Sequence, residues 1–219
     1  MISNRQLIAM IDEGESLHVE FKQRFSSHEK IAKEIIAFAN TRGGFIFLGV
    51  DDNKSIYGVE SEKSDIDLIK QTAEKFCEPP VGFDCKFISI DGKDVLVIHV
   101  PESNLKPHRI QDYKTNLDLN ESSVYIRIND KSVPASKEMI KLLQSRMAGN
   151  TLKQYEIGNN EKIVFNYLEL NEKITVKELS KLANISERRA SRTLIKLVRA
   201  DLLLIHTKDN GESYFTSVG

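Results

Sequence analysis

A cluster of basic side chains near the end of the chain is the clearest chemical signal in the sequence. Between Glu187 and Arg199 there are five basic residues and one acid, a local charge of +4 in a protein whose formal net charge is −1. Lysine and arginine bind phosphate groups, and these contacts supply most of a protein's affinity for nucleic acid. The segment therefore predicts nucleic-acid binding by a local patch, because the low net charge excludes a protein that coats polyanions indiscriminately.

The elements that must position this cluster form a small domain at the end of the chain. Ala190, Leu194 and Leu197 recur at helical spacing and predict a helix from Ser186 with one apolar stripe and a basic outer face. The rest of the domain is predicted to contain, in chain order, a helix at 161–168, a short segment at 174–176, a helix at 178–183, and, after the basic helix, strands at 202–207 and 213–217. Over about sixty residues this order resembles the winged helix-turn-helix family.

The resemblance implies a role for the basic helix. In winged helix-turn-helix proteins the second helix of the motif enters the major groove of DNA. The positions that would face the groove are Arg188, Arg189, Ser191, Arg192 and Lys196. Two other interpretations stay open: the basic face is only a solvated surface, or the domain serves dimerisation or protein contact.

Helix signals in the first part of the chain come from capping patterns. Ser3 and Gln6 have the spacing of a capping box, which predicts a helix that ends at Gly14. A second box, Ser26 with Glu29, predicts a helix that ends near Asn40. Two further helices are predicted at 64–76 and 136–147.

Strand signals alternate with these helices. Apolar and polar residues alternate over 17–22, which predicts a half-buried strand whose polar face carries His18, Glu20 and Lys22. The apolar run at 45–50 predicts a strand in the middle of a sheet. Asp91-Gly92 predicts the turn of a hairpin, and another strand is expected at 124–128.

Several linked motifs in this part of the chain have a family resemblance. They are Glu15-Ser16-Leu17-His18-Val19-Glu20-Phe21-Lys22, Ala37-Phe38-Ala39-Asn40-Thr41-Arg42-Gly43-Gly44, Leu48-Gly49-Val50-Asp51-Asp52, Tyr57-Gly58-Val59, Lys106-Pro107-His108 and Tyr125-Ile126-Arg127. Together, over roughly residues 7 to 145, they resemble the Schlafen AlbA_2 domain family. The resemblance implies nucleic-acid binding, and bacterial members joined to a helix-turn-helix are described as transcriptional regulators.

Nuclease members of the Schlafen family imply a second possibility. They cut RNA with three carboxylates, which correspond here to Glu15, Glu20 and Asp51. Such carboxylates would hold Mg²⁺ or Mn²⁺, which activates water for attack on a phosphodiester. Nothing in the chain matches the clustered zinc ligands of the Schlafen nucleases, and Lys22 and Arg42 are the nearby candidates for phosphate contacts.

Geometry sets a condition on that metal site. Five residues of extended strand span about 16 Å, too far for two ligands of one ion. The chain must therefore bend between Glu15 and Glu20. The alternative interpretation is that Glu20 is a strand carboxylate paired with Lys22 or His18, and that Glu15 and Asp51 are turn residues.

Length and composition complete the sequence-based prediction. The 219 residues predict two domains, 1–150 and 151–219, with linker candidates at 148–150 and 158–160. No signal peptide or membrane span is evident, so we expect a cytoplasmic protein. Cys77 and Cys85 lack the spacing of a zinc or redox site, and no phosphate-binding loop follows Gly43-Gly44.

The leading prediction is an α+β protein, an AlbA_2-like mixed α/β domain followed by a small winged helix-turn-helix. We expect a homodimeric, DNA-binding transcriptional regulator that needs no cofactor to bind DNA and prefers DNA to RNA. The alternative is a ribonuclease dependent on Mg²⁺ or Mn²⁺ that uses the three carboxylates. A third possibility is a protein-interaction module.

Overall fold

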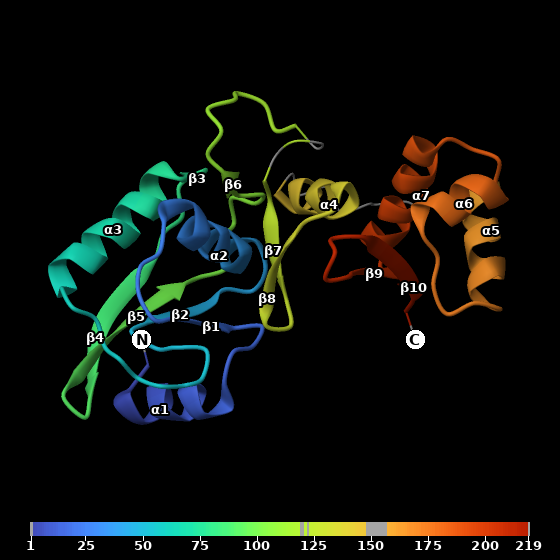
Figure 1. Ribbon diagram of the computed structural model, residues 1–219. Coiled ribbons are helices and arrows are strands. Elements are labelled where there is room, and N and C mark those ends of the chain that lie inside the picture. The colour runs from blue at the N-terminus through green and yellow to red at the C-terminus, as the bar shows by residue number, and fades with distance from the viewer. Residues whose placement is uncertain (1, 119–120, 122, 148–156, 219) are drawn as a thin grey trace. The chain divides into compact units, whose positions relative to one another are not determined.

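The computed structural model describes residues 2–118, 121, 123–147 and 157–218 and divides into two compact units, Met1–Pro134 and Ala135–Gly219. Figure 1 shows the order of their elements. The division lies ahead of the boundary predicted near residue 150, because helix α4 (Lys137–Met147) packs on helix α7 (Glu187–Arg199) and belongs to the second unit. The linker predicted at 148–150 lies outside the described residues.

The first unit is built on a four-stranded sheet. Its strands follow the order β1-β2-β5-β4, and β1 pairs with β2 in parallel while the other neighbours are antiparallel. The bounds are Val19–Lys22 for β1, Gly44–Leu48 for β2, Asp84–Ile90 for β4 and Lys93–Val100 for β5. The strand predicted at 45–50 to be central is indeed interior in the sheet.

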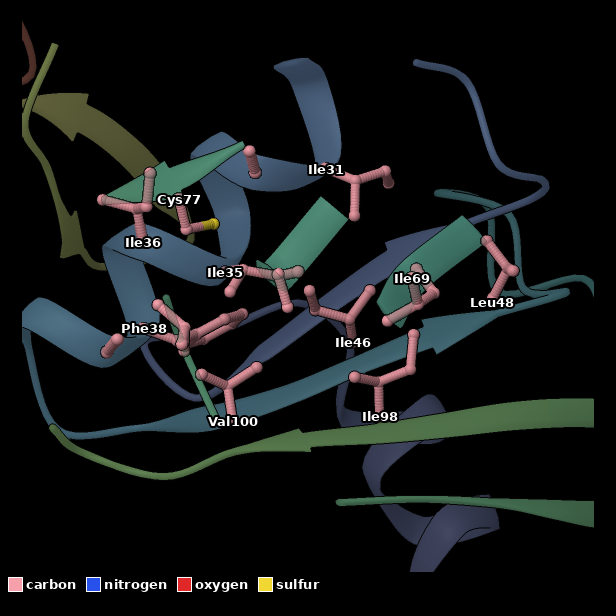
Figure 2. Close-up of a cluster of buried hydrophobic side chains, with 14 of the residues drawn as sticks. Ile31, Ile35, Ile36, Phe38, Ile46, Leu48, Ile69, Cys77, Ile98 and Val100 are labelled. Atoms are coloured by element: carbon pink, nitrogen blue, oxygen red, sulfur yellow. The ribbon is translucent and has the colours of Figure 1, made fainter. Parts of the chain in front are cut away.

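Helices cover both faces of this sheet. They are α1 (Asn4–Glu13) on one face and α2 (His28–Asn40) and α3 (Glu62–Lys75) on the other. Figure 2 shows Ile35 and Phe38 of α2 directed toward Ile46 of β2 and Ile98 of β5, and all four are fully buried. Burial of such a side chain contributes roughly 1.5–3 kcal/mol, so this layer holds α2 firmly on the sheet.

One of the two predicted capping boxes is present in the structure and the other is not. The box of Ser3 and Gln6 is present at the start of α1, and Gly14 caps the end of this helix with a positive φ of 98°. The box predicted for Ser26 is wrong, because the chain enters α2 one residue later and the hydroxyl of Ser27 accepts from the backbone N–H of Lys30.

One hairpin of the sheet and two short strand pairings complete the first unit. The β4–β5 hairpin turns through Asp91 and Gly92, both with positive φ, as the sequence predicted. Strand β3 (Cys77–Glu78) pairs with β6 (Arg109–Ile110). Strand β7 (Tyr125–Ile128) pairs with β8 (Lys131–Pro134), and β3, β6 and β8 were not predicted.

The second unit places three helices and a hairpin around its own core. After α4 come α5 (Asn159–Leu168), α6 (Val176–Leu182), α7, β9 (Leu203–Thr207) and β10 (Ser213–Ser217). Ile174 adds a two-way backbone bridge to Phe215 of β10, with N···O distances of 2.9 and 2.8 Å. The element order expected from the sequence is therefore present. Among the residues described, no helix is long and apolar enough to cross a membrane.

Candidate nucleic-acid interface and buried ion pairs

Helix α7 is oriented by its apolar side. Ser186 caps its start, where the hydroxyl accepts from the backbone N–H of Arg189 at 3.3 Å. Ala190, Leu194 and Leu197 are fully buried in the core of the second unit. Because these residues fix one side of the helix inward, the opposite side must face solvent.

Four basic side chains occupy that outward side. Arg188, Arg189, Arg192 and Lys196 are all exposed, and residues 188, 192 and 196 follow one another at the spacing of one helical turn. We call these four residues the basic face. None of the four has an ion-pair partner within the described ranges. Like charges at this spacing repel one another, so an anion bound across them is stabilising.

The basic face borders a concave site. A cavity of about 730 Å³ lies between α7 and the first turn of α5, and the residues that line it are Gly158, Asn159, Asn160, Glu161, Ser186, Arg188, Arg189, Arg192, Thr193 and Lys196. Its lining carries four cationic groups and one carboxylate. The site therefore suits a polyanion rather than an apolar ligand.

Ser191 is not part of this surface, contrary to the sequence prediction. It is 2 % exposed, and its hydroxyl donates to Glu138 at 2.7 Å and accepts from the ammonium of Lys141 at 3.0 Å. Both partners belong to α4, which covers this side of α7. The helical pattern alone placed Ser191 off the apolar stripe, but α4 packs against it there.

In the first unit, the chain bends where the metal hypothesis required a bend. Ser16 and Val19 exchange backbone hydrogen bonds in a tight turn, with N···O distances of 3.0 and 3.4 Å. The turn returns the Glu15 carboxylate to β1, where it accepts from the backbone N–H of Phe21 at 2.8 Å. Burial raises the pKa of Glu15 above its usual value; the Phe21 hydrogen bond opposes this rise and the charge of Glu20 adds to it.

Both carboxylate oxygens of Glu20 form ion pairs. It is 7 % exposed; one carboxylate oxygen accepts from the ammonium of Lys22, and the other lies 2.6 Å from the guanidinium of Arg127. Burial alone would lower the pKa of Lys22, but the adjacent Glu20 carboxylate outweighs it and raises this pKa. Strand β1 was predicted to be buried on its apolar face alone, but Glu20 on its polar face is buried too. A phosphate contact by Lys22 stays a prediction.

Arg127 is the centre of a buried network that sequence reasoning did not find. Its side chain is fully buried, and beyond Glu20 it donates to Glu34 at 3.3 Å, to the hydroxyl of Ser132 at 3.2 Å and to the backbone carbonyl of Ser16 at 2.7 Å. Its guanidinium also lies 4.7 Å from the ring centre of Phe38. The sequence shows Arg127 within the Tyr-Ile-Arg motif, but no local pattern connects it to carboxylates about a hundred residues earlier.

The three predicted carboxylates are not gathered into a metal site. Within the part of the chain that the structure describes, no group of three or more His, Cys, Asp or Glu residues could hold a metal ion. Asp51 lies in a turn closed by a backbone hydrogen bond to Ser55 at 3.0 Å, and it is Asp52 whose charge acts on Glu15. Arg42, the other predicted phosphate contact, is exposed in the turn after α2.

Comparison with known proteins identifies the family to which the first unit is similar. The family model described as Schlafen, AlbA_2 matches residues 15–136, more than half of the chain. The chain belongs to this family. The Schlafen AlbA_2 domain contains Glu15, Glu20 and Arg127, whereas the basic face lies outside it.

Two solved structures are similar to parts of the chain. One is the N-terminal domain of a RecG-related protein from Nitrosomonas europaea, which is 26 % identical with a TM-score of 0.43 and covers 53 % of this chain and 84 % of its own. The other is the DIP2311 protein from Corynebacterium diphtheriae, which is 19 % identical with a TM-score of 0.43 and covers 60 % of this chain and 30 % of its own. Both TM-scores are below 0.5, so the family assignment rests on the sequence match.

The Lys106-Pro107-His108 segment of the Schlafen AlbA_2 domain has a structural role. Asn40 of α2 accepts from the backbone N–H of His108 and donates to its carbonyl, both at 2.8 Å. The imidazole of His108 contacts the carbonyl of Pro79 at 2.7 Å and the hydroxyl of Ser103 at 2.6 Å. Burial lowers the pKa of His108, which favours a neutral ring. These contacts fasten the loop after β5 to α2.

Proposed function

We propose that this protein binds nucleic acid through its second unit, a winged helix-turn-helix, and acts as a DNA-binding transcriptional regulator. The observation that carries the proposal is the basic face of α7, on which four exposed cationic side chains have no ion-pair partner among the described residues. Their positive charge matches the phosphate backbone, which dominates the affinity of such complexes.

The shape of the surface favours duplex DNA over duplex RNA. An exposed helix fits the major groove of B-form DNA, which is about 12 Å wide. The major groove of A-form RNA is too deep and narrow for side chains to read. In this arrangement α7 is the recognition helix, and the β9–β10 hairpin with its tip at Lys208 is the wing that touches the backbone. A homodimer would present two such helices to a palindromic site.

The test is a titration of fluorescently labelled duplex DNA with the full chain. Arg188→Ala with Arg192→Ala removes two cations from the basic face, and we expect binding to weaken by about 10-fold or more. The slope of log affinity against log salt should fall by about 2, because each neutralised phosphate contributes roughly 0.9. The matched control is Lys63→Ala with Lys70→Ala, which removes two exposed cations from α3.

The outcome separates the interpretations. Weaker binding in the α7 variant, with the α3 control unchanged, supports the groove assignment. Equal affinity of the α7 variant and the unmodified chain refutes it. Absence of any salt-sensitive binding favours the protein-interaction module.

One observation keeps the nuclease as a second candidate. The turn at 16–19 brings the Glu15 carboxylate to within 2.8 Å of the backbone N–H of Phe21, the residue that follows Glu20. The test incubates labelled RNA with the chain in Mg²⁺, Mn²⁺ or EDTA. Cleavage that needs the metal and is lost in Glu15→Gln supports the nuclease, and intact RNA in all three conditions refutes it.

A further inference from the structure

A second cavity lies in the first unit, at the carboxyl ends of the parallel strands β1 and β2. Its volume is about 520 Å³, within the range of pockets that bind small molecules. It is lined by the residues just after β1, by the segment around Tyr57 and by one side of α3, and none of the three predicted carboxylates lines it. In open sheets, ligands bind in crevices outside the carboxyl ends of parallel strands.

One part of the cavity lining is apolar and aromatic. Phe25, Tyr57 and Leu68 contribute to it. Tyr57 is 54 % exposed and lines the cavity, so its ring is accessible to a ligand there. A flat ring system can stack against such a surface.

The backbone beneath Tyr57 is already fixed. The carbonyl of Gly49 accepts from the N–H groups of both Tyr57 and Gly58, at 2.8 and 3.0 Å. A Cβ added to Gly49 would lie 2.9 Å from the carbonyl carbon of Gly58, so only glycine allows this close approach. The backbone that carries Tyr57 is therefore preformed, which lowers the entropic cost of binding, although the ring itself is exposed.

The polar groups of the cavity differ in sign. Arg24 is exposed and has no ion-pair partner in the described part of the chain. Glu60 and Asp65 supply two carboxylates. Burial raises the pKa of Asp65; a backbone hydrogen bond from Ser61 opposes the rise and the charge of Glu60 adds to it. One cation with two hydrogen-bond acceptors suits a ligand that carries one phosphate and a donor-rich edge.

We propose that this cavity binds a guanine nucleotide with a single phosphate. The base stacks on Tyr57, the phosphate meets Arg24, and Asp65 accepts hydrogen bonds from the guanine edge. Guanine presents its ring N–H and its exocyclic amino group side by side, so one carboxylate can accept from both. Adenine pairs a donor with an acceptor on the same edge, and the acceptor would face the carboxylate unfavourably. Additional phosphates are disfavoured by Glu60 and Asp65.

The same chemistry has two sources, a free nucleotide and a guanine within a single strand. Calorimetric titrations of the full chain with guanosine monophosphate, adenosine monophosphate, inorganic phosphate and a guanine-containing RNA pentamer distinguish them. We expect saturable binding of the guanine ligands with a preference over adenosine monophosphate. If guanosine monophosphate and the pentamer bind with equal affinity, the ligand is the free nucleotide. If the pentamer binds at least tenfold more tightly, the ligand is a guanine within a single strand.

Two substitutions test the roles proposed for Tyr57 and Arg24. Tyr57→Ala should weaken guanine binding by about 10-fold, because stacking on an aromatic ring contributes roughly 1–3 kcal/mol per base. Arg24→Ala should weaken binding of the monophosphate but leave binding of guanosine unchanged. The controls are Tyr113→Ala, which removes an 88 % exposed tyrosine outside the cavity, and Arg5→Ala, which removes an exposed arginine of α1.

The proposal is overturned if neither guanine ligand binds at millimolar concentration, or if Tyr57→Ala binds as tightly as the unmodified chain. Equal affinity for guanine and adenine monophosphates also overturns it, because Asp65 would then not read the base. The variant Arg188→Ala with Arg192→Ala should bind guanosine monophosphate normally, so failure of this site and failure of the DNA interface are separate results.

Discussion

Replacement of Arg127 by methionine tests whether the buried ion pairs hold the Schlafen AlbA_2 domain together. Methionine keeps much of the length of the arginine side chain and removes its charge and its donors. In the structure those donors reach Glu20 at 2.6 Å, Glu34 at 3.3 Å and the carbonyl of Ser16 at 2.7 Å. The substitution leaves two buried carboxylates without their shared cation.

The expected cost follows from that loss. Removal of one partner from a buried ion pair destabilises a protein by about 3–5 kcal/mol, because the remaining charge is neither solvated nor paired. Lys22 still neutralises part of the Glu20 charge, which places the expected value near the lower end. With a urea dependence of about 2 kcal/mol per molar, the unfolding midpoint should fall by roughly 1.5–2 M.

The assay must report on each unit separately, and the chain contains no tryptophan. Hydrogen exchange read by mass spectrometry across a urea series meets this need. Peptides from β2 and β5 report the first unit, while peptides from α7 serve as an internal control that should not shift. Arg42→Met makes the same chemical change at an exposed position and should leave both midpoints within about 0.3 M, since such surface changes cost less than about 0.5 kcal/mol.

A midpoint shift below about 0.5 M for Arg127→Met would refute the reasoning, because it would correspond to only about 1 kcal/mol. Arg127→Lys gives a second measure if the methionine variant does not fold. Lysine keeps the charge but lacks the planar fork of donors, so we expect a smaller destabilisation.

Three further predictions concern single side chains. Because burial raises the folded-state pKa of Glu15, folding stability should fall as pH rises from about 4.5 through that raised value, and Glu15→Gln should abolish this part of the pH dependence in urea titrations. Ser191→Ala should destabilise the second unit by about 1–3 kcal/mol, because the Glu138 and Lys141 partners lose its hydroxyl, yet leave DNA affinity unchanged. Burial raises the pKa of Cys77 to about 12, so iodoacetamide at pH 8 should label the half-buried Cys85 before it labels Cys77 in the native chain, as read by mass spectrometry.

Local signals in the sequence predicted local structure well. The capping box at Ser3, the Asp91-Gly92 turn and the basic helix from Ser186 each depend on residues that are close together in the sequence. The strand at 213–217 was predicted with the bounds that the structure has. Strands β3 and β6 were missed because two-residue strands give too short a pattern to recognise, and β8 was missed because Val133 is its one aliphatic residue.

Long-range partners explain what the sequence did not reveal about the sites. Glu20 carries the alternation of a half-exposed strand, and the long-range ion pair with Arg127 of β7 helps to make its burial possible. Ser191 lies on the polar side of α7 in a helical projection, but α4 covers it. The four residues of the basic face could be predicted because they are exposed, and their position depends on no residue that is distant in the sequence.

The position of Arg127 has a consequence for solubility. Strand β1 is at the edge of the four-stranded sheet, and an edge strand with free backbone groups can recruit strands from other molecules. Here the turn at Ser16 folds back over Val19, and the guanidinium donates to the carbonyls of both residues, at 2.7 and 3.3 Å. The same side chain that neutralises two carboxylates thus occupies backbone acceptors that a foreign strand would need. Variants at Arg127 that still fold should therefore show a greater tendency to form intermolecular β-sheet aggregates.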